Sequence, residues 1–319
     1  MMRQAIVLPL MLILVAGGIA AAQKPEGGQQ GARPRQPTHA DVKYGPYARN
    51  VMDVWLAKSE KPAPVLVSIH GGGFLQGDKN VAPRLLDECL KAGISVAAIT
   101  YRFSSEAIAP ASFLDSARAI QFLRTRAKAW NLDASRIAAT GGSAGAGISL
   151  WLGFHSDLAD PGSSDPVLRQ SSRLTCMAVY EGQTSYDPRF IRDLFPGTDT
   201  YKHLALAKLF DVDMDQLDRL PKEKYKLFED VSAINHLTKD APPALLIYSS
   251  TLDTKITGQG AGIHHPRFAV VLKEKMDALG IECQVRLGIG PGTEERTKLT
   301  MDFLRKHFGT RCQVSIATL

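Results

Sequence analysis

At residues 136–145 the chain reads Arg-Ile-Ala-Ala-Thr-Gly-Gly-Ser-Ala-Gly, and a run of mostly apolar residues continues from there to His155. The short apolar run at 136–140 predicts a buried strand, and the longer run at 144–155 predicts a helix. The glycines between them predict a tight turn. A buried strand that passes directly into a helix is typical of an α/β fold.

Ser143 occupies the centre of this turn, with Gly141, Ala144 and Gly145 around it. A nucleophile elbow turns so sharply that the residues flanking the nucleophile must be small, and these residues meet that need. The hydroxyl would then project at a helix N-terminus, where developing negative charge is stabilised. A Gly-x-Ser-x-Gly string alone is weak evidence, but its place between a strand and a helix makes Ser143 a candidate nucleophile.

Short apolar runs alternate with longer amphipathic runs along the rest of the chain as well. The predicted strands are 65–70, 95–101, 136–140, 176–180, 244–248 and 284–289, and the predicted helices are 85–91, 112–129, 144–155, 266–279 and 294–307. Continuous apolar strands alternating with helices predict a mostly parallel sheet with helices on both faces. The fold class predicted is therefore α/β.

Residues 41–309 are long enough for one large domain and show no internal repeat. The segment 183–242 interrupts the alternation because it is mostly polar and helical and lies between two predicted strands. Such an insertion would lie over the carboxyl ends of the strands, where open α/β sheets bind ligands. It is either a small helical cap over a site or a surface excursion without a role.

The N-terminal 22 residues have the pattern of a secretory signal peptide: Arg3, an apolar run, and small residues at Ala20-Ala21-Ala22. A membrane anchor is the alternative, but the run is short for a span and glycines interrupt it. Residues 23–40 are rich in Gly, Gln and Pro and predict a flexible leader, and 310–319 form a C-terminal tail. The sequence thus predicts a secreted or periplasmic protein with no membrane span after cleavage.

The formal net charge is +6, and the basic residues are scattered among acidic ones. This predicts a mildly basic surface and argues against nucleic-acid binding. The four cysteines show no metal-ligand spacing. Cys283 and Cys312 flank the last predicted strand and helix and are the pair that could form a disulfide, which export permits.

A second glycine-rich motif, His70-Gly-Gly-Gly-Phe74, follows the predicted strand at 65–70. Glycines at such a place let backbone N–H groups point into a site without obstruction by side chains. Gly72 and Gly73, together with the N–H of Ala144, are the candidate donors of an oxyanion hole. His70 is expected to orient this loop by hydrogen bonding rather than to act as a base.

With these two motifs in this order, the chain resembles the α/β-hydrolase fold, and within it the hormone-sensitive-lipase-like, bacterial carboxylesterase and feruloyl-esterase-like branch. The resemblance runs from about residue 41 to 308. It includes a stretch similar to the family's Tyr-Arg-x-x-x-Glu segment: Tyr101-Arg102, Glu106, Pro110 and Asp115.

The resemblance implies Ser143 as the nucleophile, and Gly72, Gly73 and Ala144 as the oxyanion hole. It also implies that a catalytic acid follows the strand ending near residue 248. Asp253 is the carboxylate in that loop and matches the acid position. A solvated turn residue is the alternative interpretation of Asp253.

The family's base should lie in the loop after the last strand, but residues 290–296 contain no histidine. His264 and His265 follow Asp253 through a glycine-rich loop and are the candidates for a relocated base. His265 precedes Pro266, which suits a first helical turn, so packing or capping of that helix is the alternative.

Two functions of different classes follow. One is an exported serine carboxylic-ester hydrolase that acts through an acyl-enzyme on small-molecule esters or acylated carbohydrates. The other is a catalytically impaired homologue that binds an ester or carbohydrate, because a serine hydroxyl is a weak nucleophile without a base. A peptidase is a weaker third option. No cofactor is predicted, and His39, His155, His203 and His236 show no metal-ligand spacing in the sequence.

Overall fold

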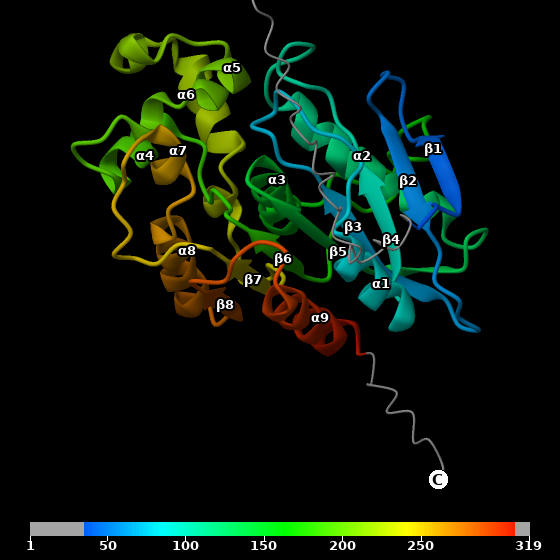
Figure 1. Cartoon of the computed structure of the whole chain (residues 1–319). Helices are drawn as coiled ribbons and strands as arrows, with labels where there is room; N and C mark the ends of the chain where they lie inside the picture. The colour runs from blue at the N-terminus through cyan, green and yellow to red at the C-terminus, as the bar shows by residue number, and fades with distance from the viewer. Residues whose placement is uncertain (1–34, 310–319) are drawn as a thin grey trace, which may run out of the picture. The chain divides into compact units, whose positions relative to one another are not determined.

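The computed structural model describes residues 35–309, which fold around one eight-stranded sheet (Figure 1). The strands are β1 (His39–Lys43), β2 (Val51–Trp55), β3 (Ala63–Ile69), β4 (Ser95–Ile99), β5 (Leu132–Gly142), β6 (Met177–Tyr180), β7 (Ala244–Ile247) and β8 (Cys283–Arg286). Their order across the sheet is β1-β2-β4-β3-β5-β6-β7-β8. The pairs β1–β2 and β2–β4 are antiparallel and all others are parallel, which confirms the predicted fold class.

Nine α-helices and three 3₁₀-helices are found in the described residues. They are α1 (Pro83–Lys91), α2 (Ala111–Arg126), α3 (Ala144–Phe154), α4 (Pro188–Leu194), η1 (Thr200–Lys202), α5 (Leu204–Phe210), η2 (Met214–Arg219), α6 (Lys222–Asp230), η3 (Ala233–His236), α7 (Gln259–Ile263), α8 (Arg267–Ala278) and α9 (Glu294–Phe308).

The sheet is covered on both faces, because successive side chains of a buried strand point to opposite sides. Val65, Val67 and Ile69 of β3 belong to the larger apolar cluster, which also contains residues of α2, α3 and α8. Leu66 of the same strand belongs to a second cluster with residues of α1 and α9. A continuous apolar strand has apolar side chains on both faces of the sheet, so each face needs its own hydrophobic core.

Three elements were missed by the sequence patterns: β1, β2 and α7. The strand β1 is an edge strand with mostly exposed residues, so it carries little apolar signal. It begins at His39, inside the segment 23–40 that was predicted to be a flexible leader, and Trp55 Nε1 donates to Arg35 O at 2.8 Å. Residues 35–40 therefore have a defined structure where the composition predicted a flexible leader.

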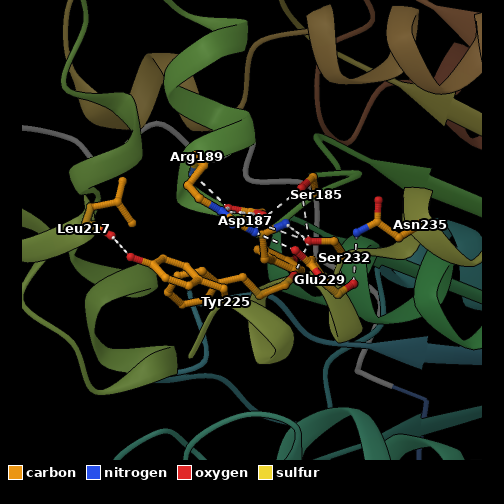
Figure 2. A network of polar contacts seen from close by, with 10 residues as sticks. Ser185, Asp187, Arg189, Leu217, Tyr225, Glu229, Ser232 and Asn235 are labelled. Carbon is orange, nitrogen blue, oxygen red and sulfur yellow. Dashed lines mark hydrogen bonds and ion pairs between the residues drawn. The ribbon is translucent and has the colours of Figure 1, made fainter. Parts of the chain in front are cut away.

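The segment between β6 and β7 contains α4, η1, α5, η2, α6 and η3. A polar network ties α4, η2, α6 and η3 together (Figure 2). Ser232 Oγ accepts from the backbone N–H groups of Tyr186 at 2.9 Å and Asp187 at 3.1 Å. Arg189 bridges Asp187 at 2.6 Å and Glu229 at 2.9 Å. Short helices with few intrahelical bonds gain their order from such contacts.

Several sequence-based predictions lie outside the described residues. These are the signal peptide at 1–22, most of the leader, the tail at 310–319 and Cys312. Cys283, its candidate disulfide partner, is buried at the start of β8. Between residues 35 and 309, no helix combines the length and apolar character needed to cross a membrane.

Candidate active site

Ser143 lies between the end of β5 and the start of α3, with φ 52° and ψ −118°. This strained backbone is what a nucleophile elbow requires. Gly145 is needed beside it, since a Cβ atom there would lie 2.0 Å from Ile69 O. The Ser143 N–H donates to Tyr180 O at 2.9 Å, which anchors the turn to β6. The predicted strand–turn–helix at this position is therefore present.

The imidazole of His264 lies against this serine. Ser143 Oγ and His264 Nε2 are 2.8 Å apart, within hydrogen-bond distance. His264 is the C-cap residue of α7, the short helix that follows β7. The structure thus brings a base candidate to Ser143 from the loop after β7, and not from the loop after β8.

The other ring nitrogen of His264 fixes its tautomer. Nδ1 lies 2.9 Å from Gly260 O, one turn earlier in the chain, and must donate its proton to that carbonyl. Nε2 is then the unprotonated nitrogen, so the Ser143 hydroxyl donates to it. This is the arrangement in which a histidine can remove the serine proton.

Gln183 holds the segment that carries His264. Its side-chain amide donates to Ile263 O at 2.7 Å and to Glu181 O at 3.0 Å, and the residue is buried. Gln183 lies just after β6, so the amide connects the end of that strand to α7. No motif in the sequence marked this glutamine or the Gly260 carbonyl, because both act through contacts between distant segments.

The structure brings neither Asp253 nor His265 to Ser143. The exposed Asp253 carboxylate accepts from Thr251 Oγ1, and this hydrogen bond lowers the pKa of the carboxyl group. No hydrogen bond or ion pair joins Asp253 to His264 among residues 35–309. His265 is buried, and its Nδ1 accepts from Arg267 N at 3.2 Å at the start of α8, the capping role considered for it.

Gly72, Gly73 and Ala144 surround the same position. Gly72 and Gly73 have φ values of +96° and +60°, a region that favours glycine. Within residues 35–309, the backbone N–H groups of these three residues have no hydrogen-bond acceptor. Since all three residues and Ser143 line one cavity, the N–H groups are available to a ligand there.

His70 supports this glycine loop. Its Nδ1 donates to Gly71 O at 2.8 Å, and its ring stacks on Tyr101 with centroids 4.2 Å apart. Tyr101 in turn donates its hydroxyl to His70 O at 3.0 Å. Burial lowers the pKa of His70, and the charge of Arg49 acts in the same direction. Both effects favour the neutral ring, which supports the loop through these contacts.

The cavity at Ser143 has a volume of about 560 Å³. Its wall is mostly apolar and includes Phe74, Leu204, Leu206 and Ile263. Leu204 and Leu206 come from α5, so the segment between β6 and β7 contributes directly to the wall. Its volume lies in the ordinary range for sites that bind small molecules.

His203 also lines this cavity, next to the catalytic candidates. Its Nδ1 accepts from Ala205 N at 3.2 Å. Burial lowers the pKa of His203, and the neighbouring His264 lowers it further. His203 comes from the predicted insertion, so no sequence pattern placed it beside Ser143.

A second cavity, of about 670 Å³, shares Gly72 and Gln76 with the cavity at Ser143 and is also lined by Gly71 and Gly142. Its wall is mostly apolar too, and includes Asn80, Tyr180, Arg296 and residues of the loop after β8. The Arg296 guanidinium lies over the Tyr180 ring, 3.6 Å from its centroid.

A family model described as BD-FAE matches residues 52–261, which is more than half of the chain and includes Ser143 and the glycine loop. The chain belongs to the BD-FAE family. The matched region ends at residue 261, so His264 lies just beyond it.

Relatives of this family member are named as esterases. Esterase LipC of Mycobacterium tuberculosis is 26% identical over 212 residues, which cover 66% of this chain and 50% of LipC. A probable isoprenylcysteine alpha-carbonyl methylesterase of Arabidopsis thaliana, ICMEL1, is 25% identical over 210 residues, covering 66% of this chain and 43% of that protein. The chain thus matches half or less of the length of these relatives.

Solved structures show the same fold. A truncated carbohydrate esterase from gut microbiota superposes with a TM-score of 0.66 at 23% identity, over 86% of this chain and 98% of that one. An acetyl ester-xyloside bifunctional hydrolase from Caldicellulosiruptor lactoaceticus gives 0.63 at 21% identity, over 82% and 88%. These likenesses establish the α/β-hydrolase architecture.

Proposed function

We propose that the chain is a carboxylic ester hydrolase in which Ser143 is the nucleophile and His264 is the base. The observation that carries this proposal is the 2.8 Å distance between Ser143 Oγ and His264 Nε2. The esterase names of the relatives support the same activity.

In this mechanism Ser143 Oγ forms a bond to the ester carbonyl carbon while its proton passes to His264 Nε2. The carbonyl oxygen becomes an oxyanion and accepts hydrogen bonds from the N–H groups of Gly72, Gly73 and Ala144. The C–O bond to the alcohol then breaks, and Nε2 returns the proton to the leaving oxygen. Water attacks the acyl-enzyme by the same route and restores the serine.

The group that orients the base is the Gly260 carbonyl in this proposal. In a Ser-His-Asp triad the carboxylate fixes the tautomer and stabilises the imidazolium that forms. Gly260 O fixes the tautomer equally well but offers a dipole in place of a full charge. Turnover should therefore be slower than with a carboxylate and much faster than without a base. The acid role of Asp253 stays a prediction from the sequence.

The two cavities support a division of the substrate. The apolar cavity at Ser143 is suited to a short acyl group. The second cavity shares Gly72 and Gln76 with it, and Asn80, Tyr180 and Arg296 in its mostly apolar wall are hydrogen-bonding groups for the alcohol part of the ester. We therefore favour small-molecule esters and acylated carbohydrates as substrates. Export to the periplasm or medium, predicted from residues 1–22, is part of this proposal.

The test is hydrolysis of p-nitrophenyl acetate and p-nitrophenyl butyrate by residues 23–319 and by the Ser143→Ala variant. Steady turnover that the substitution abolishes supports the proposal. Ser149→Ala is a matched control, because this hydroxyl of α3 donates to Gly145 O at 2.7 Å and does not line the cavity. Equal turnover by the native protein and Ser143→Ala would exclude Ser143 as a nucleophile for these esters.

An impaired homologue that only binds an ester or carbohydrate is the second candidate. Two observations favour it: residues 290–296 contain no histidine, and Nδ1 of His264 has no carboxylate partner in the described chain. Binding of an acylated sugar without turnover above that of Ser143→Ala would establish this function.

A further inference from the structure

Three residues that the sequence left unrelated meet at the far end of α3. His155 is the C-cap of α3, Asp230 ends α6, and His236 ends η3. Each offers one ligand atom, and these atoms lie within 4.8 Å of one another. The two imidazole centroids are 4.5 Å apart. Both histidines are half-buried and Asp230 is exposed, so solvent can reach the group.

The hydrogen bonds of the two histidines leave one nitrogen of each ring unprotonated. His155 Nδ1 lies 2.9 Å from Ser156 O, and His236 Nε2 bonds to Asp230 O, so each of these nitrogens donates its proton to a carbonyl. Metal-binding histidines almost always donate their second N–H in this way. Among residues 35–309, no partner is found for His155 Nε2, His236 Nδ1 or the Asp230 carboxylate.

The backbone that carries these ligands is fixed from several directions. Trp151 Nε1 donates to Asp230 O at 2.8 Å, and the Trp151 ring packs against His155 with centroids 4.2 Å apart. Asn235 donates its side-chain amide to Glu229 O at 3.0 Å, within the network shown in Figure 2. The turn between α6 and η3 is thus held in place before any ligand binds.

The position also suits positive charge. His155 follows the last turn of α3, where the carbonyl groups of the helix create a partial negative charge. Arg173 acts in the opposite direction, because it donates to His155 O at 3.4 Å. The positive charge of Arg173 should therefore weaken the binding of a cation here, relative to a structural site with four protein ligands.

We propose that His155, Asp230 and His236 bind a divalent transition-metal ion of the zinc type. Two imidazoles and one carboxylate are common zinc ligands, and water would complete a tetrahedron. Tetrahedral ligands lie about 3.3–3.5 Å apart for bonds of about 2.0–2.1 Å, so ligand atoms that lie up to 4.8 Å apart must approach by up to about 1.5 Å. Mg²⁺ is excluded as the preferred ion because it selects oxygen ligands.

This site is separate from Ser143. The two lie at opposite ends of α3, whose 11 residues span about 16 Å. A metal here would join the end of α3 to α6 and η3, and so attach the segment between β6 and β7 to the core. Its role would be to stabilise the fold and not to act on the ester.

The experiment uses untagged protein dialysed against EDTA and titrated with ZnCl₂ by calorimetry, with MgCl₂ as the negative control. His236→Gln and Asp230→Asn each remove one ligand with little change of shape. His39→Gln is the matched control, since this histidine stacks on Trp130 at another place.

The expected result is one Zn²⁺ per chain, no heat with Mg²⁺, and affinity lowered at least about tenfold in both ligand variants. At equal Zn²⁺ concentration the Tm should rise in the native protein and in His39→Gln, and should rise less in the two ligand variants, because stabilisation falls as Kd increases. Co²⁺ should give the visible absorption of a tetrahedral ion. No Zn²⁺ binding, or equal affinity in His236→Gln, Asp230→Asn and the native protein, would overturn the proposal.

Discussion

The substitution Gly262→Ala tests whether the packing of α7 positions the base. Gly262 lies two residues before His264, and a Cβ atom added to it would lie 1.9 Å from Thr200 Oγ1 and 2.8 Å from Thr200 Cγ2. Ordinary contact begins near 3.4 Å, so α7 and η1 must separate by up to about 1.5 Å if Thr200 keeps its rotamer, and they must still separate if it rotates, because its Cβ atom lies 2.9 Å away. Because His264 is the C-cap of α7, the imidazole moves with the helix.

The expected loss follows from that displacement. A misplacement of about 1 Å in a catalytic group can cost about 10²-fold in rate. Overpacking of a buried site also costs about 1–3 kcal/mol of stability. Gly262→Ala should therefore lower kcat for p-nitrophenyl acetate about a hundredfold and lower the Tm by several degrees.

Two further variants complete this experiment. Gly258→Ala is the control, because its backbone is extended and nothing lies within 4 Å of the added Cβ atom. Thr200→Gly, combined with Gly262→Ala, removes the clashing atoms and should restore most of the activity. Native kcat and Tm in Gly262→Ala would refute the argument, and so would a loss that the double variant does not recover.

Three other predictions follow from the site. Asp253→Asn should change kcat/KM by no more than about threefold, since exposed substitutions shift energies by about 0.5 kcal/mol. Removal of a carboxylate that held the imidazole would instead lower the rate about 10⁴-fold. A loss of that size in a pH-matched assay would show that Asp253 is the catalytic acid. Gly72→Ala should lower kcat about 10²–10³-fold with little change in KM. The added Cβ atom would lie 2.0 Å from Gln76 O and would displace the N–H donors of the oxyanion hole. An unchanged kcat in steady-state kinetics would contradict the role of these donors. Burial lowers the pKa of His70 and His203 below 6.5, so the unfolded chain binds more protons in mild acid. Their contribution to stability is complete above about pH 6.5 and is lost as the pH falls through the folded-state pKa values, so the Tm should drop between pH 7.5 and 5.5 in calorimetry, and a constant or rising Tm would contradict this.

The sheet could be predicted because its strands carry their own signal. The apolar runs at β3, β4, β5, β6 and β7 are buried on both sides, so each is recognisable without knowledge of its neighbours. The edge strand β1 has no such run, and only the structure reveals that it pairs with β2. The elbow was predictable for the same local reason, since its small residues adjoin Ser143 in sequence.

The base was only partly predictable. The glycine-rich sequence of α7 has low helix propensity, so it was expected to be a loop. It is helical because Gly262 fits closely against Thr200, and because Gln183 holds Ile263 O. Both contacts join segments about sixty or more residues apart, so the sequence could name His264 and His265 but could not choose between them.

The metal site was not predictable at all from spacing. His155 and His236 are 81 residues apart and belong to no metal-ligand spacing pattern. They meet because α3 packs against η3, and Trp151 on α3 binds Asp230 O. Ligands assembled from three helix ends leave no short motif.

His264, and not His265 or a residue of the loop after β8, is the proposed base that activates Ser143. The most direct measurement is the rate of the p-nitrophenolate burst with p-nitrophenyl acetate in the native protein, His264→Ala and His265→Ala, with intact-mass detection of the acetyl group. We expect acetylation of Ser143 in the native protein, a burst slowed about 10²–10⁴-fold in His264→Ala, and a burst largely retained in His265→Ala. An equal burst rate in His264→Ala and the native protein would contradict the account.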